Sequence, residues 1–168
     1  MANVLYPLPH DHIPHDDMPH HEMSLPLAER VTGGGPIWLL GRVIIGGVFV
    51  MSGSQKLMGL DQFAASLVRD GVPNNLTPIL APLGACVETL GGLCIVFGLA
   101  TSWASLVMIA FVITAAFLGH RFWQYEGQIR GLQQANFTKN IMIAAAFCLL
   151  YVAGGGPYSI DRWRRQRR

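Results

Sequence analysis

Charged residues are scarce in this 168-residue chain. Only 13% of the residues are Asp, Glu, Lys or Arg, whereas 51% are hydrophobic, and the mean hydropathy is +0.36. An average soluble domain carries about a quarter of its residues as charged side chains. So few charges cannot cover a surface that faces water on every side, which excludes a soluble enzyme or a disordered chain. The composition indicates a protein whose main solvent is lipid.

Cysteine is scarce as well, and its spacing excludes a disulfide scaffold. Cys86, Cys94 and Cys148 lie in apolar stretches without a C-x-x-C motif. On a helix, Cys86 and Cys94 would be about 12 Å apart along the axis, too far for a disulfide. No haem ligand pair, iron-sulfur cysteine set, flavin motif or nicotinamide motif is present. Residues 1–35 lack the pattern of a removable secretory signal, so the first membrane helix is expected to act as the insertion signal.

Four apolar stretches approach the length of about 20 residues that a bilayer-spanning helix needs. They cover residues 37–57, 76–100 and 103–123, and a shorter stretch covers 139–152. The second stretch is connected to the third only through Ala100-Thr101-Ser102, which predicts a tight antiparallel hairpin. The polar residues before the second stretch and those in 124–137 are expected to form surface links.

These features predict an all-α integral membrane protein, an antiparallel four-helix bundle with an extended N-terminal tail. Residues 1–35 form the His- and Pro-rich tail, 36–161 the transmembrane domain and 162–168 a basic C-terminal tail. Because four crossings place both ends on one side and the last tail is rich in arginine, we expect both termini in the cytoplasm. Arg69, Arg130 and Lys139 fall on the opposite side and oppose this orientation.

Glycine recurs every seven residues in two of the predicted helices. Gly46 and Gly53 lie in the first, and Gly84, Gly91 and Gly98 in the second. Small residues at such a spacing allow helix backbones to approach closely in a membrane, so these stripes are expected to face the interior of the bundle. Glycine scattered through membrane helices without a packing role is the alternative.

Several ionisable side chains fall at membrane depth, where each needs a partner, water or a short path to the interface. Glu88 is near the middle of the second helix, on the stripe that carries Gly84 and Gly91. The cationic and polar residues of the other helices converge on the predicted outer half of the bundle: Lys56, His120, Arg121, Lys139 and Asn140.

Two interpretations of these residues remain open. In the functional one, Lys56 or Arg121 holds an ionised Glu88 in a polar pocket, and His120 exchanges protons or bonds a carbonyl ligand; Asn140 belongs to the same set. In the structural one, Glu88 and His120 only join neighbouring helices, while the long cationic side chains snorkel to the interfaces. Snorkelling is the favoured account of Arg42 and Lys139.

Short pieces in a fixed order resemble the DoxX family of small four-helix membrane proteins. The pieces span residues 36–161, and they are Gly41-Arg42, Ser52-Gly53, Lys56-Leu57, Glu88 with Gly91-Gly92, His120-Arg121-Phe122-Trp123, Phe137 with Lys139-Asn140, and Gly156-Pro157-Tyr158-Ser159-Ile160-Asp161. The resemblance implies a multi-pass subunit associated with membrane oxidoreductases. Relatives include a subunit of a thiosulfate:quinone oxidoreductase, and others are linked to thiol redox defence.

The N-terminal tail carries imidazoles that could hold a transition metal. These are His10, His12, His15, His20 and His21, set among acidic residues. The prolines between them prevent a helix that would align the ligands, so an extended tail without metal is expected. We also expect the C-terminal arginines to contact this acidic tail or to be attracted to anionic lipid.

Three functions fit this sequence. The leading hypothesis is an accessory subunit of a bacterial inner-membrane redox or energy-transducing complex, docked through its helices and N-terminal tail. The alternative is a quinone-interacting component of an oxidoreductase, in which Lys56, Glu88 and His120 form the site and a partner supplies the electrons. A small transporter or proton conduit is the third hypothesis, and it is the weakest because the sequence shows no clear inverted repeat. We expect lipids and other subunits as partners, quinone or lipid as ligand, no covalent cofactor and no nucleic acid.

Overall fold

The computed structural model describes residues 35–167, so residues 1–34 of the predicted tail, with its five histidines, lie outside the described part. Regular structure in residues 35–167 is entirely helical, and the elements are α3 (Gly35–Met58), α4 (Leu60–Arg69), α5 (Thr77–Phe97), α6 (Thr101–Gly119), the short 3-10 helix η2 (Phe122–Gln124), α7 (Gly127–Ala153) and α8 (Ile160–Gln166). The helices α3, α5, α6 (with η2) and α7 are long and apolar enough to cross a membrane. The predicted all-α fold with four spans is thus confirmed.

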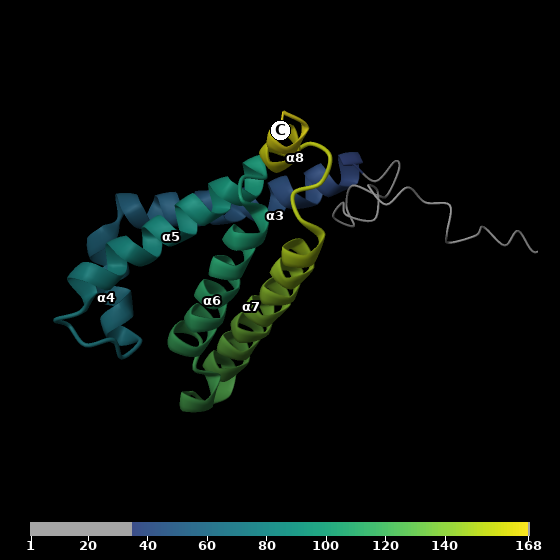
Figure 1. Cartoon of the computed structure of the whole chain (residues 1–168). Helices are drawn as coiled ribbons and strands as arrows, with labels where there is room; N and C mark the ends of the chain where they lie inside the picture. Colours follow the sequence, from purple (N-terminus) through teal and green to yellow (C-terminus); the bar gives the residue numbers. More distant parts are fainter. Residues whose placement is uncertain (1–34, 168) are drawn as a thin grey trace, which may run out of the picture.

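The four long helices pack in two pairs, α3 with α5 and α6 with α7 (Figure 1). The two pairs meet through the rings of Phe49 on α3 and Phe147 on α7, whose centroids are 5.4 Å apart. Around this contact lies a small core of buried apolar side chains that includes Ile95, Met108 and Val112. Most other large apolar side chains of the spans are exposed, as expected for surfaces that face acyl chains.

The helices α5 and α6 touch near their connecting turn and diverge beyond it (Figure 1). Close to the turn, Gly91 lies directly against Met108. Farther along, the atoms nearest to a Cβ at Gly84 belong to the rings of Phe63 and Phe111, at 3.8 and 3.9 Å. The predicted tight hairpin therefore holds at the turn only, because each helix packs along its length against a different partner.

The glycine stripes have different surroundings. Gly46 and Gly53 lie against α5, where a Cβ at Gly46 would be 2.7 Å from the carbonyl oxygen of Gly92. Gly92, which was not in the predicted stripe, is thus the closest partner of Gly46. Gly98 does not extend the stripe, because it ends α5 in the left-handed conformation (φ +64°) beside the Arg42 guanidinium.

Two segments expected to be polar links contain helix. The segment 124–137 forms the start of α7, which begins at Gly127 and runs for 27 residues. The segment before α5 contains α4, whose Phe63 and Leu67 face α5 and α6. Polarity indicates a position near the membrane surface, but it does not prevent a helix whose polar side chains point to water.

The short helix α8 closes the end where the two pairs meet (Figure 1). The Asp161 carboxylate accepts hydrogen bonds from the backbone N–H of Ala100 (2.7 Å) and of Thr101 (2.8 Å), and so caps the start of α6. Arg42, only 2% exposed, donates to the carbonyl oxygens of Gly155 and Tyr158. Snorkelling of Arg42 to water is therefore wrong, since these loop carbonyls need donors and the guanidinium supplies them inside the protein.

Candidate functional site

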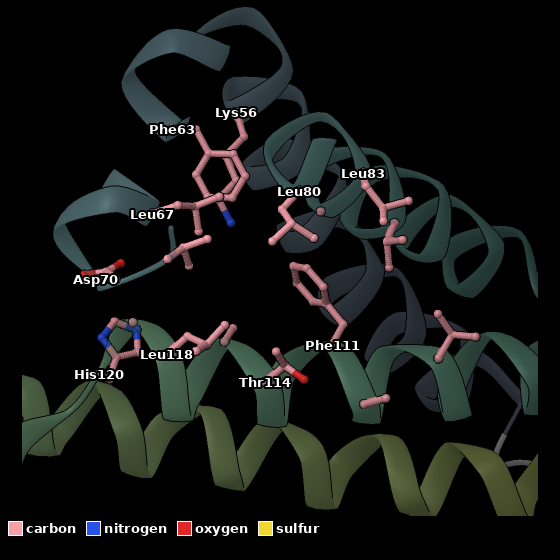
Figure 2. A pocket seen from close by; sticks show the side chains of 17 residues that line it. Lys56, Phe63, Leu67, Asp70, Leu80, Leu83, Phe111, Thr114, Leu118 and His120 are labelled. Atoms are coloured by element: carbon pink, nitrogen blue, oxygen red, sulfur yellow. The ribbon is translucent and has the colours of Figure 1, made fainter. Parts of the chain in front are cut away.

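A pocket of about 490 Å³ opens where α5 and α6 diverge, and α4 forms part of its wall (Figure 2). We call it the interhelical pocket. Its apolar lining consists of Phe63, Leu67, Val72, Leu80, Leu83, Gly84, Val87, Val107, Ala110, Phe111, Ala115, Leu118 and Gly119. Its polar lining consists of Lys56, Asp70, Thr114 and His120. The volume falls in the range of about 300–1,000 Å³ that is typical of small-molecule sites.

Lys56 brings a cation into this apolar enclosure. It lies in the last turn of α3, and its ammonium group is 5.1 Å from the centroid of the Phe63 ring and 5.9 Å from that of Phe111. Figure 2 shows its nitrogen pointing into the space between α4, α5 and α6. The two ring faces stabilise the cation, which makes this position less costly than a purely aliphatic one.

Glu88, on the side of Lys56 that faces away from the pocket, holds the Lys56 ammonium group in place. Its carboxylate, 3% exposed, accepts a hydrogen bond from the Lys56 ammonium and forms an ion pair with it. Glu88 does not line the pocket itself. Because an ammonium has three N–H donors and the described residues provide only this one acceptor, two donors of Lys56 remain available to a ligand.

Asp70 and His120 lie at one end of the pocket, which we call its mouth, where the end of α4 faces the end of α6, whereas Thr114 lies farther back along α6 (Figure 2). Asp70 ends α4, and its Oδ2 is 3.7 Å from the position of a Cβ at Gly119. His120 ends α6, and its Nδ1 is 2.9 Å from Oε1 of Gln133 on α7. That contact orients the imidazole, with the N–H donating to the amide oxygen in the Nδ1-protonated tautomer.

Arg121 approaches Asp70 and not Glu88. Its guanidinium lies against Gly71, where a Cβ would be 2.8 Å from Nη2. Gly71 has φ +87°, so glycine suits this turn both for its conformation and for the space that Arg121 occupies. Burial raises the pKa of Asp70, while the positive charges of Arg121, His120 and Arg69 oppose that shift.

Aromatic packing positions the end of α6. The rings of Phe122 and Phe137 are 5.4 Å apart, and Trp123 is 6.1 Å from Phe137. These contacts hold the turn between α6 and α7 and so present His120 and Arg121 towards α4. The four-residue run His120-Arg121-Phe122-Trp123 thus combines two polar side chains at the pocket mouth with two aromatic anchors.

The predicted site residues therefore divide into groups. The structure brings Lys56 and His120 to one pocket and places Glu88 directly behind Lys56. Arg121 is near the mouth, beside Gly71, whereas Asn140 is half-buried on α7 and does not line the pocket. In residues 35–167, no three His, Cys, Asp or Glu side chains are close enough to hold a metal ion.

Asp70 is the site residue that sequence reasoning missed. It lies in a segment interpreted as a surface link, and its carboxylate reaches the pocket only because α4 folds back against α5. The four-residue spacing of Phe63 and Leu67 was the available signal, since it predicts an amphipathic helix with one face turned inward.

Comparison with known proteins relates the chain to membrane proteins of one family. The DoxX family model matches residues 37–121. The chain is 36% identical over 128 residues to inner membrane protein YphA of Escherichia coli, which covers 74% of this chain and 87% of that relative. It is 32% identical over 124 residues to inner membrane protein YqjF of the same organism, covering 74% and 88% respectively. No solved structure matches the chain significantly. By its family model and its relatives, the chain belongs to the DoxX family.

Proposed function

We propose that this protein is a membrane subunit of a bacterial redox complex and that its interhelical pocket binds a quinone. The observation that carries the proposal is an apolar pocket of about 490 Å³ between spanning helices, into which the Lys56 ammonium group presents two N–H donors that Glu88 does not use. A quinone ring needs apolar walls, aromatic neighbours and hydrogen-bond donors for its two carbonyl oxygens. Phe63, Phe111 and Lys56 supply this set.

The residues of the pocket divide the work of binding. Phe63 and Phe111 would pack on the ring, and the aliphatic side chains of α5 and α6 would surround its tail. Lys56 would donate to one carbonyl oxygen while Glu88 keeps the ammonium in place and balances its charge. A quinone contributes its own two-electron chemistry, and the chain's part is to bind, orient and surround it.

A second component supplies electrons in this proposal, because the sequence carries no motif for a haem, flavin, nicotinamide or iron-sulfur centre. We therefore retain the role of an accessory subunit that docks on other subunits through its helices and N-terminal tail. Purification in mild detergent, followed by mass spectrometry, identifies what accompanies the chain. If deletion of residues 1–30 leaves the occupancy of the complex unchanged, the tail is not its anchor.

The binding claim is tested with a matched pair of leucines on α6. Leu118 lines the pocket, whereas Leu106, of similar exposure, does not. We expect the Leu118→Trp variant to lose about tenfold or more in affinity for tritiated decylubiquinone in lipid nanodiscs, a change of about 1.4 kcal/mol. Leu106→Trp should bind as the wild type does.

The same experiment separates quinone from lipid. Wild-type protein that retains no more decylubiquinone than empty nanodiscs do would refute the quinone site. If the Leu118→Trp variant binds decylubiquinone as tightly as wild type, the ligand lies elsewhere. Competition by a phospholipid at low stoichiometry would assign the pocket to a lipid instead.

We also propose an inner-membrane location with both termini in the cytoplasm. The location rests on the two relatives, both named as inner membrane proteins, and the orientation on the C-terminal arginines. A green fluorescent protein fused after Arg168 should fluoresce, because it folds in the cytoplasm. Active alkaline phosphatase fused at the same position would show that the C-terminus lies outside the cytoplasm and would contradict the proposed orientation.

A further inference from the structure

Asp70 is a half-buried carboxylate at the mouth of the pocket with no direct partner. Its backbone N–H bonds to the carbonyl oxygen of Ser66 (2.9 Å), which fixes it at the end of α4. Within residues 35–167, no hydrogen bond or ion pair within 4 Å ends on its side chain. The carboxylate instead faces the pocket beside Gly119 (Figure 2). A ligand in the pocket would therefore meet a free carboxyl group.

The charged groups around Asp70 come from three elements. Arg69 precedes it on α4, His120 and Arg121 face it from the end of α6, and Lys56 on α3 lines the same pocket. Lys56 is engaged by Glu88, and the His120 ring contacts Gln133. Burial raises the pKa of the Asp70 carboxyl, while the positive charges favour its ionised form. Burial and the neighbouring positive charges thus act on the protonation of Asp70 in opposite directions.

The two states of a carboxyl group have opposite hydrogen-bonding roles. A neutral carboxyl donates through its O–H, whereas a carboxylate only accepts. A quinone ring presents carbonyl oxygens, which accept, and the corresponding quinol presents hydroxyl groups, which donate. The protonation state of Asp70 therefore determines which form of the ring finds a complementary partner at the mouth.

We propose that Asp70 selects the redox state of the ring bound in the interhelical pocket. Neutral Asp70 donates to a carbonyl oxygen and retains the quinone; ionised Asp70 accepts from a hydroxyl group and retains the quinol. This inference rests on the proposed function, since it assumes that the pocket takes a quinone. It makes occupancy of the pocket depend on pH: low pH favours binding of the quinone, and high pH favours binding of the quinol.

The experiment measures the affinity of the full-length protein in nanodiscs for decylubiquinone and, without oxygen, for decylubiquinol, across a pH series. In wild type, the affinity for the quinone should fall as the pH rises through the pKa of Asp70, by up to about tenfold per pH unit for one linked proton. The affinity for the quinol should rise over the same interval. Asp70→Asn, which is neutral at every pH, should flatten both profiles while still binding quinone.

Three further variants assign the effect. Asp61→Asn removes an exposed carboxylate from the same helix and should leave both slopes unchanged. His120→Gln should keep both slopes, with their midpoint moved to higher pH because the charge of His120 favours ionised Asp70. Arg121→Gln removes a charge that favours ionised Asp70, so the midpoint of both profiles should move to higher pH.

The outcomes separate this inference from the proposed function. If neither ring form binds wild type at any pH, the proposed function fails and takes this inference with it. If both bind, but the slopes persist in Asp70→Asn, vanish in His120→Gln or run in the same direction for quinone and quinol, the role of Asp70 is refuted while the quinone site stands.

Discussion

Single side chains explain how this chain holds charge at membrane depth. Arg42 and Glu88 are both nearly buried, yet they solve the problem differently. Glu88 is paired with a lysine from another helix, whereas Arg42 is surrounded by backbone carbonyl oxygens of the segment after α7. The first arrangement presents a cation to a pocket, and the second joins the two helix pairs.

The junction at Arg42 gives a first prediction. Arg42→Met has a similar reach but no donors, so the carbonyl oxygens of Gly155 and Tyr158 lose their partner. We expect the free energy of unfolding to fall by about 2 kcal/mol. Arg130→Met, at an exposed position on α7, is the control and should cost little. Equal denaturation midpoints for the two variants would show that the junction does not stabilise the fold.

Asp70 gives a prediction on stability and pH. Its pKa is raised from the ordinary value of 3.8 in the folded protein, so the folded state binds this proton more tightly than the unfolded chain. The resulting stability is full below pH 3.8 and is lost as the pH rises through the folded pKa. Asp70→Asn stays neutral and avoids that loss. The melting temperature of Asp70→Asn should therefore rise relative to that of the wild type as the pH increases above 3.8 through the folded pKa of Asp70. A difference in melting temperature between Asp70→Asn and wild type that stays constant or shrinks as the pH rises contradicts this account.

At the scale of elements, glycine determines which helices pair. The backbones of α3 and α5 come close at Gly46 and Gly92, leaving no space for a side chain. No comparable seam joins α5 to α6, where Gly91 meets the flexible thioether of Met108. The close seam keeps α5 on α3 and leaves room for the pocket on its other side.

The seam is tested by a matched pair of alanine substitutions. A Cβ at Gly92 would lie 2.8 Å from the carbonyl oxygen of Gly46, whereas a Cβ at Gly47 meets nothing within 4 Å. We expect Gly92→Ala to lower the free energy of unfolding by about 1–3 kcal/mol, because backbone must move. Gly47→Ala should be neutral or slightly stabilising. Similar midpoints in a denaturant titration would mean that the seam is not closely packed.

The elements also show how far sequence reasoning reaches. The four spans follow from apolar length alone, because lipid requires it, and this part was predicted. The helices within the polar stretches were not predicted, because α4 and the first turns of α7 depend on an amphipathic pattern that is shorter than a membrane span. The pairing of helices was not predicted either: Gly92 lies beside Gly91, and a shift of one residue rotates the seam to another face.

At the scale of the whole molecule, the site arises from the way the two helix pairs meet. They are joined at one end by α8, Asp161 and Arg42, and α5 diverges from α6 towards the other end (Figure 1). The pocket occupies that divergence, so its volume depends on tertiary arrangement and leaves no motif in the sequence. Sequence reasoning selected Lys56, Glu88 and His120 as intramembrane polar residues, but it could not find Asp70 without the position of α4.

The central claim is that a quinone ring occupies the space between the two helix pairs. Photolysis of the purified protein with an azidobenzoquinone that carries the same ten-carbon tail, followed by peptide mapping, tests it most directly. The account predicts adducts on Phe63, Phe111 or Thr114 that excess decylubiquinone suppresses. Adducts confined to exposed side chains such as Ile37 and Leu149, insensitive to that competitor, would contradict it.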